Sequence, residues 1–106
     1  MRVLEFIADG QTLKKDPRCD FAGIVAGSRG YLRACFSFSK DWSGCKKVAV
    51  FSCNGKNYPA PLDYNMCEIP AGALTGTAVQ VYLVGRRPGF EITTSATAFP
   101  QQPMLR

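Results

Sequence analysis

The chain has 106 residues, of which 46% are hydrophobic and 20% charged, and its formal net charge is +5. These values fit a single globular domain and exclude a disordered chain. No apolar run approaches the roughly 20 residues of a membrane-spanning helix, which excludes a transmembrane segment of that kind. Residues 1–6 carry a glutamate among their apolar residues, so we expect no secretion signal.

The positive charge is scattered along the chain in short groups such as Lys14-Lys15. No long basic block is present, and no interleaving of basic and aromatic residues like that of RNA-binding sheets. Dedicated nucleic-acid binding is therefore disfavoured, and an acidic protein surface remains as a partner for the charge.

Histidine is absent from the sequence. Without it, neither a Ser-His-Asp triad nor a Cys-His pair can be built. The carboxylates lie mostly in predicted turns, where aspartate accepts local backbone hydrogen bonds, and the sequence pairs no two of them across a cleft. Glycine-rich phosphate-binding motifs and zinc-ligand spacings are also missing. We therefore predict no enzyme, no catalytic residue, no cofactor and no metal site.

The cysteines are odd in number and form no C-x-x-C pair. We expect reduced thiols that pack as small hydrophobic side chains. The missing secretion signal agrees with a reducing compartment. The five residues are Cys19, Cys35, Cys45, Cys53 and Cys67.

The first third of the chain predicts short extended segments. Residues 3–8 predict a strand, Asp9-Gly10 a turn and residues 12–14 a short return strand. A further extended segment is expected at residues 21–25, followed by a glycine-rich turn.

The stretch from residue 31 to residue 57 organises the rest of the chain. Its first strand alternates strictly between apolar and more polar side chains, which places one set on a buried face. The second strand, residues 47–53, is apolar on both faces at its middle, as in a strand covered on both sides. The alternating apolar residues of the first strand are Leu32, Ala34, Phe36 and Phe38.

A tight hairpin follows the second strand. Asn54-Gly55 predicts a type I′ turn, because that turn needs positive φ at both central residues. Residues 56–62 should pair back as a short edge strand, since Pro59 and Pro61 cannot donate to a ladder.

Trp42, the only tryptophan, lies in a predicted corner at residues 39–44. We expect a buried ring that bridges two strands and closes one end of the fold, because aromatic side chains contribute most to stability when they are buried. The alternative is an exposed stacking platform for a sugar or a base.

The last third of the chain continues the pattern of short elements, with one helical turn that has proline at its first position. The elements are a strand at 66–69, the helical turn at 70–74, a strand at 77–84, a hairpin loop at 85–89 and a strand at 90–98.

Seven to nine short strands at spacings of about 8 to 12 residues indicate an antiparallel β-sandwich. We therefore predict an all-β, single-domain fold over residues 1–99, with an irregular C-terminal tail at residues 100–106. Its expected core residues are Phe36, Phe38, Trp42, Phe51 and Val81.

Three stretches of the chain carry a resemblance. FSFSKDWSGCKKVAVF resembles F-x-F-S-x-x-W-x-G-x-x-K-x-A-x-F, CEIPAGAL resembles C-x-I-P-x-x-x-L, and VYLVGRRPGFEITT resembles V-x-V-x-G-x-x-x-G-x-x-x-T-T. Together they resemble small structural proteins of phages and prophages of Gram-positive hosts, including the N-terminal domains of upper-baseplate and tail-fibre proteins.

The resemblance implies a β-sandwich that docks other virion proteins and performs no catalysis. It covers residues 6–94, and its motifs are chiefly core and turn positions. Fibre proteins continue into long stalks, whereas this chain ends after the predicted sandwich, so tail, baseplate and head-decoration roles all stay open. The implied location is the virion or the host cytoplasm.

Two basic pairs are candidate partner contacts. Arg86-Arg87 lies on the predicted hairpin loop, and Lys46-Lys47 lies close to the corner tryptophan. Arginine is enriched at interface hot spots, so these pairs are either solvated surface or anchors for an acidic partner. The partner would be another phage protein or a host protein, and we also expect a homo-oligomer, because edge strands promote association.

Two rival functions remain on the sequence alone. The first is a prophage-encoded inhibitor of a bacterial defence system, anti-CRISPR-like and acting by steric blocking. The second is a carbohydrate-binding module that stacks sugars on exposed rings. The candidate platforms are Trp42, Tyr31, Tyr58, Tyr64 and Tyr82.

Overall fold

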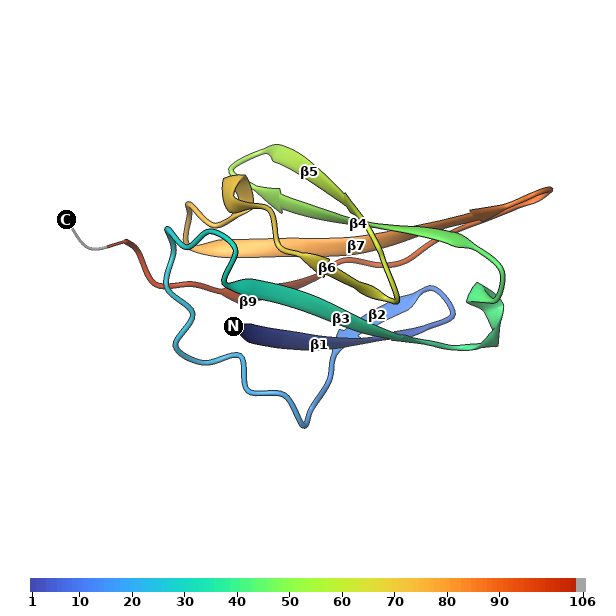
Figure 1. The fold of residues 1–106 in the computed structure, drawn as a ribbon, viewed down its shortest axis with the longest axis horizontal. Helices are drawn as coiled ribbons and strands as arrows, with labels where there is room; N and C mark the ends of the chain where they lie inside the picture. The colour runs from blue at the N-terminus through green and yellow to red at the C-terminus, as the bar shows by residue number, and fades with distance from the viewer. Residues whose placement is uncertain (105–106) are drawn as a thin grey trace.

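The computed structural model describes residues 1–104, which fold into nine strands and two single 3-10 turns arranged in two layers (Figure 1). This confirms the predicted all-β sandwich. No helix within the described residues is long and apolar enough to cross a bilayer. The strands are β1 (Arg2–Asp9), β2 (Thr12–Lys15), β3 (Leu32–Phe38), β4 (Lys46–Cys53), β5 (Lys56–Pro61), β6 (Met66–Glu68), β7 (Ala78–Arg87), β8 (Phe90–Thr93) and β9 (Thr97–Pro100). The 3-10 turns are η1 (Lys40–Trp42) and η2 (Ala71–Ala73).

The first sheet has the strand order β2-β1-β3-β6. Its central pair, β1 and β3, is parallel, an exception to the antiparallel rule that governs every other strand pair of the described chain. A parallel pair needs a crossover connection, and residues 16–31 provide it. The extended segment predicted at residues 21–25 forms no strand: it makes turns and one bridge, from Val25 to Gln102. Its apolar residues cover the core instead: Ile24 is buried, and the Phe21 ring meets Phe6 edge-on at 5.4 Å.

The second sheet has the order β5-β4-β7-β8, and β9 also pairs with β7. The strand predicted at residues 90–98 is thus divided into β8 and β9. The division occurs where Thr94 turns inward: its Oγ1 accepts a hydrogen bond from Leu83 N at 2.9 Å, and its N donates to Leu83 O. Ser95 N then donates to Gln11 O, so this segment ties β7 to the turn that ends β1.

Strand β7 is longer than predicted and runs through Arg87. The expected loop at residues 85–89 is therefore wrong for its first three residues. The turn is formed by Pro88-Gly89, and Gly89 supplies the positive φ of 72° that a tight reversal requires. Arg86 and Arg87 consequently lie on a paired strand with fixed orientation.

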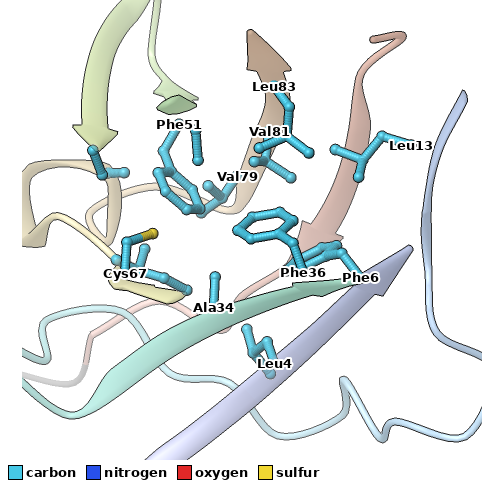
Figure 2. Close-up of a cluster of buried hydrophobic side chains, with 14 of the residues drawn as sticks. Leu4, Phe6, Leu13, Ala34, Phe36, Phe51, Cys67, Val79, Val81 and Leu83 are labelled. Atoms are coloured by element: carbon cyan, nitrogen blue, oxygen red, sulfur yellow. The ribbon is translucent and has the colours of Figure 1, made fainter. Parts of the chain in front are cut away.

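The core lies between the two sheets (Figure 2). Phe6 and Phe36 come from neighbouring strands of the first sheet and stack at 5.2 Å, facing the valines of β7. Phe36, Trp42, Phe51 and Val81 are buried, and Phe38 is half-buried against them.

The chain remains ordered by hydrogen bonds beyond residue 99, where an irregular tail was predicted. Pro100 ends β9, and Gln101 is buried, with its N donating to Thr77 O at 2.9 Å. Gln102 N donates to Ile24 O at 2.7 Å. Pro100 therefore belongs to β9 and not to the predicted tail, whereas Gln101 lies outside any strand and Gln102 forms one isolated bridge to Val25. Positions 105–106 of the predicted tail lie outside the described residues.

Candidate docking surface

The outer faces of the two sheets differ in character. On the first sheet, charges of both signs are interspersed: Arg33 is the register partner of Glu68 and lies beside Val3, and Glu5 follows two residues along β1. Mixed charge of this kind is typical of a solvated face. The outer face of the second sheet is apolar along its middle and basic at one end.

The register of the second sheet places apolar side chains next to one another. Ala49 and Phe51 point into the core, so the residues that alternate with them point outward. Along β4 these outward residues pair across the sheet with outward residues of β5 and β7. The resulting apolar strip consists of Val48, Val50, Pro59, Pro61, Tyr82 and Val84. Val50, at its middle, is itself only 9% exposed.

Lys46 and Arg86 close one end of the strip as register partners on β4 and β7. Arg86 Nε lies 3.0 Å from Glu91 Oε2, and the two side chains are 70% and 58% exposed, so solvent screens this pair. Lys46 forms no salt bridge within residues 1–104. This end of the strip therefore has a net positive charge.

Two adjoining hollows mark this surface. One of about 310 Å³ lies between Lys46, Val48, Val84 and Arg86. The other, of about 460 Å³, continues from Lys46 and Val48 around the start of β4. We call the two hollows together the β4 groove. The remaining residues that line the second hollow are Cys45, Lys47, Pro61, Leu62, Tyr64 and Asn65.

The second members of the two basic pairs have contacts of their own. Lys47 Nζ lies 4.8 Å from the centre of the Phe38 ring, a cation–π contact. Arg87 Nη1 donates to Asp41 O at 3.2 Å and to Ser43 O at 2.8 Å. Its guanidinium also lies 3.7 Å from the centre of the Phe90 ring. Arg87 thus fastens the tip of the β7–β8 hairpin to the η1 corner.

Trp42 is fully buried, which rules it out as a sugar platform. Its indole Nε1 donates to Gly10 O at 3.0 Å, and its ring lies 5.2 Å from that of Phe38. Of the tyrosines in the carbohydrate hypothesis, Tyr31 and Tyr64 are exposed, whereas Tyr58 and Tyr82 are half-buried. The two exposed rings belong to different hollows, one beside Arg2 and Val25 and the other in the β4 groove, so they form no common platform.

The thiols and carboxylates are arranged without a reactive cluster among the described residues. Burial raises the pKa of Cys67 to about 12, and it also raises the pKa of Cys35, to which the negative charge of Glu5 adds. Both thiols are therefore held in the protonated form at neutral pH. Within residues 1–104 no three His, Cys, Asp or Glu side chains come close enough to hold a metal ion.

The sequence named Lys46 and Arg86 but not the apolar strip between them and β5. The sequence feature that could have indicated the strip is the middle of β4, which is apolar on both faces. On the outer face Val50 is only 9% exposed, whereas Val48 borders the open 310 Å³ hollow.

Neither the protein-family models, nor the curated proteins, nor the solved structures contain a match to this chain.

Proposed function

We propose that this chain is a non-catalytic docking module that binds an acidic protein surface through the β4 groove, as a structural component of a phage or prophage virion. The open apolar strip that ends in Lys46 and Arg86 is the observation that supports the binding role. Covering such a strip releases about 25 cal/mol for each Å² of apolar surface removed from water. The virion context is supported by the sequence motifs described above.

The charge of the groove argues for a different protein as the occupant. A second copy that docked by the same face would offer Lys46 no free carboxylate, because none lines the groove and Glu91 already pairs with Arg86. An acidic partner is attracted instead, and the chain's net charge of +5 would steer its approach. Any homo-oligomer within the virion would then use another surface.

The edge of the second sheet does not favour the alternative route of strand addition. Leu62 N donates to Lys47 O, so the N–H groups of alternate β5 residues point toward β4. Pro59 and Pro61 occupy the intervening positions, whose N–H groups would point away from β4. The β5 edge therefore lacks outward backbone donors at these two positions, which disfavours the addition of another strand there.

The test is co-expression with each structural protein encoded beside this one, followed by size-exclusion chromatography with light scattering. We expect a stable complex with one of them that is lost in the K46E/R86E variant. The K14E/R29E variant is the matched control, because it changes the net charge equally at exposed positions outside the groove. A complex that tolerates K46E/R86E, or the absence of any complex, would overturn the proposal.

Co-expression with host defence nucleases is the parallel arm of this experiment. A complex found only there would replace the virion role with that of a steric inhibitor, while the groove would remain the binding surface.

A further inference from the structure

The turn between β5 and β6 has an unusual residue at its first central position. Asp63 and Met66 exchange both backbone hydrogen bonds, at 2.8 Å and 3.0 Å, and enclose a two-residue turn. Its central residues are Tyr64, with φ of 52°, and Asn65, with φ of 62°. These angles belong to a type I′ turn, whose first position favours asparagine, aspartate or glycine.

The fold gains no packing from tyrosine at this position. Tyr64 is 94% exposed, the highest value among the large hydrophobic residues of the described chain. The left-handed conformation is unfavourable for a bulky side chain. Its ring also makes no aromatic or cation–π contact within residues 1–104. Tyr64 is thus held in an unfavourable backbone conformation with no compensating contact inside the chain.

The turn is held rigidly beside the β4 groove. Asn65 O accepts a hydrogen bond from Phe36 N at 2.9 Å, which fixes the turn to β3. Tyr64 lines the 460 Å³ hollow together with Lys46 and Leu62. The ring is therefore presented to solvent at the wall of the groove, on a backbone that is bonded on both sides.

We propose that Tyr64 is the anchor that holds an acidic–apolar segment of the partner protein in the β4 groove. The ring packs over an apolar side chain of the segment, and Lys46 pairs with a carboxylate that flanks it. Tyrosine is enriched at interface hot spots because it offers a large rigid surface at low conformational cost. This inference rests on the proposed docking function and adds the residue and the partner chemistry that give the groove its selectivity.

A peptide titration followed by ¹⁵N NMR tests the proposal. The probe is acetyl-Asp-Glu-Leu-Phe-Asp-Glu-amide, and its charge-reversed counterpart is acetyl-Lys-Arg-Leu-Phe-Arg-Lys-amide. We expect the acidic peptide to shift the amides of Lys46, Val48 and Tyr64, and the basic peptide to leave them unchanged. Binding of neither peptide, or of both equally, would overturn the proposed function together with this inference.

The Y64N variant tests the anchor role of Tyr64 separately from the docking function of the groove. Asparagine suits the turn, so we expect the thermal midpoint of Y64N to equal or exceed that of the wild type, while its peptide affinity falls at least tenfold. The matched control is Y31N, which removes an exposed tyrosine from a hollow outside the groove and should leave the affinity unchanged.

Three results would overturn the anchor role. The first is a Y64N variant that binds like the wild type while K46E/R86E loses binding, which leaves the docking function standing. The second is an equal loss of affinity in Y31N. The third is a lower midpoint for Y64N, which would show that the ring supports the fold.

Discussion

At the scale of single residues, Gly85 makes room for the indole that closes the fold. A Cβ atom at this position would lie 2.7 Å from Cζ3 and 2.8 Å from Cε3 of Trp42. Both tryptophan atoms belong to a rigid, fully buried ring that is also held by its hydrogen bond to Gly10. Only glycine therefore fits at position 85 of β7 without displacing the indole ring.

We expect Gly85→Ala to destabilise the protein by about 1–3 kcal/mol, the usual cost of overpacking a core. Chemical denaturation with urea measures the change in the free energy of unfolding. Gly89→Ala is the control, because a Cβ there meets nothing within 4 Å and its cost, about 1 kcal/mol, comes only from the positive φ. A Gly85→Ala variant as stable as the wild type would contradict the packing described for Trp42.

Asp16 gives the fold a dependence on acid. Its carboxylate accepts hydrogen bonds from the Arg18 side chain, at 3.3 Å and 3.2 Å, and from Arg18 N at 2.9 Å. These bonds hold the pKa of Asp16 below its ordinary value of 3.8. A lowered pKa in the folded state stabilises the fold above the unfolded pKa, and this contribution is lost as pH falls through the folded value.

We expect wild type to exceed Asp16→Asn in urea midpoint by a constant margin above about pH 5, and the margin to shrink below about pH 4. Denaturation series at several pH values measure it. A margin that stays constant down to pH 3 would show that the carboxylate charge has no such role.

The buried thiol of Cys67 should be the least reactive of the five. Its pKa of about 12 leaves almost no thiolate at pH 8, and its side chain is buried. We expect iodoacetamide to label Cys19 and Cys45, which are half-buried, before Cys67, as read by peptide mass spectrometry. Early labelling of Cys67 in the native protein would contradict its place in the core.

At the scale of elements, the prolines of β5 protect an edge. They occupy the positions whose N–H groups would face solvent, so they remove no hydrogen bond to β4. We expect the Pro59→Ala/Pro61→Ala variant to lose about 1 kcal/mol or less and to self-associate more strongly, because free donors return to the edge. Light scattering at increasing concentration measures the association, and a variant that associates no more than the wild type would contradict this role.

Elements with local signals were predictable from the sequence. The hairpin of β4 and β5 follows from Asn54-Gly55, whose φ values are 54° and 76°. The parallel pairing of β1 and β3 and the division of β8 from β9 were not predictable, because both depend on partners distant in sequence. At the end of β8, for example, the Leu83 N–H is taken by the Thr94 side chain, whose Oγ1 accepts it at 2.9 Å.

The candidate site was predictable only in part for the same reason. Lys46 and Arg86 stand out by charge, but their pairing across two strands is a matter of register. The groove draws on segments of β4, β5 and β7 and on the turn at Tyr64, and only the folded chain brings them together.

At the scale of the whole molecule, the two sheets present unlike surfaces on opposite sides of one body. The first sheet carries interspersed charges of both signs, and the second sheet combines an apolar strip with a basic end. An interface formed by the second sheet gains affinity from apolar burial and from charge attraction. Salt screens only the charge attraction.

We therefore expect the complex with the acidic partner to weaken severalfold between about 0.05 M and about 0.5 M salt and then to level off. Surface plasmon resonance would show this mainly as a slower association rate. Affinity that does not change with salt would remove Lys46 and Arg86 from the interface.

The parallel pairing of β1 with β3 also bears on the kinetics of self-organisation. The β4–β5 hairpin closes through two residues, whereas pairing β1 with β3 closes a loop that contains β2 and residues 16–31. Closing a longer loop costs more conformational entropy, and contacts between residues distant in sequence form more slowly. Pairing of β1 with β3 should accordingly be slower than closure of the β4–β5 hairpin.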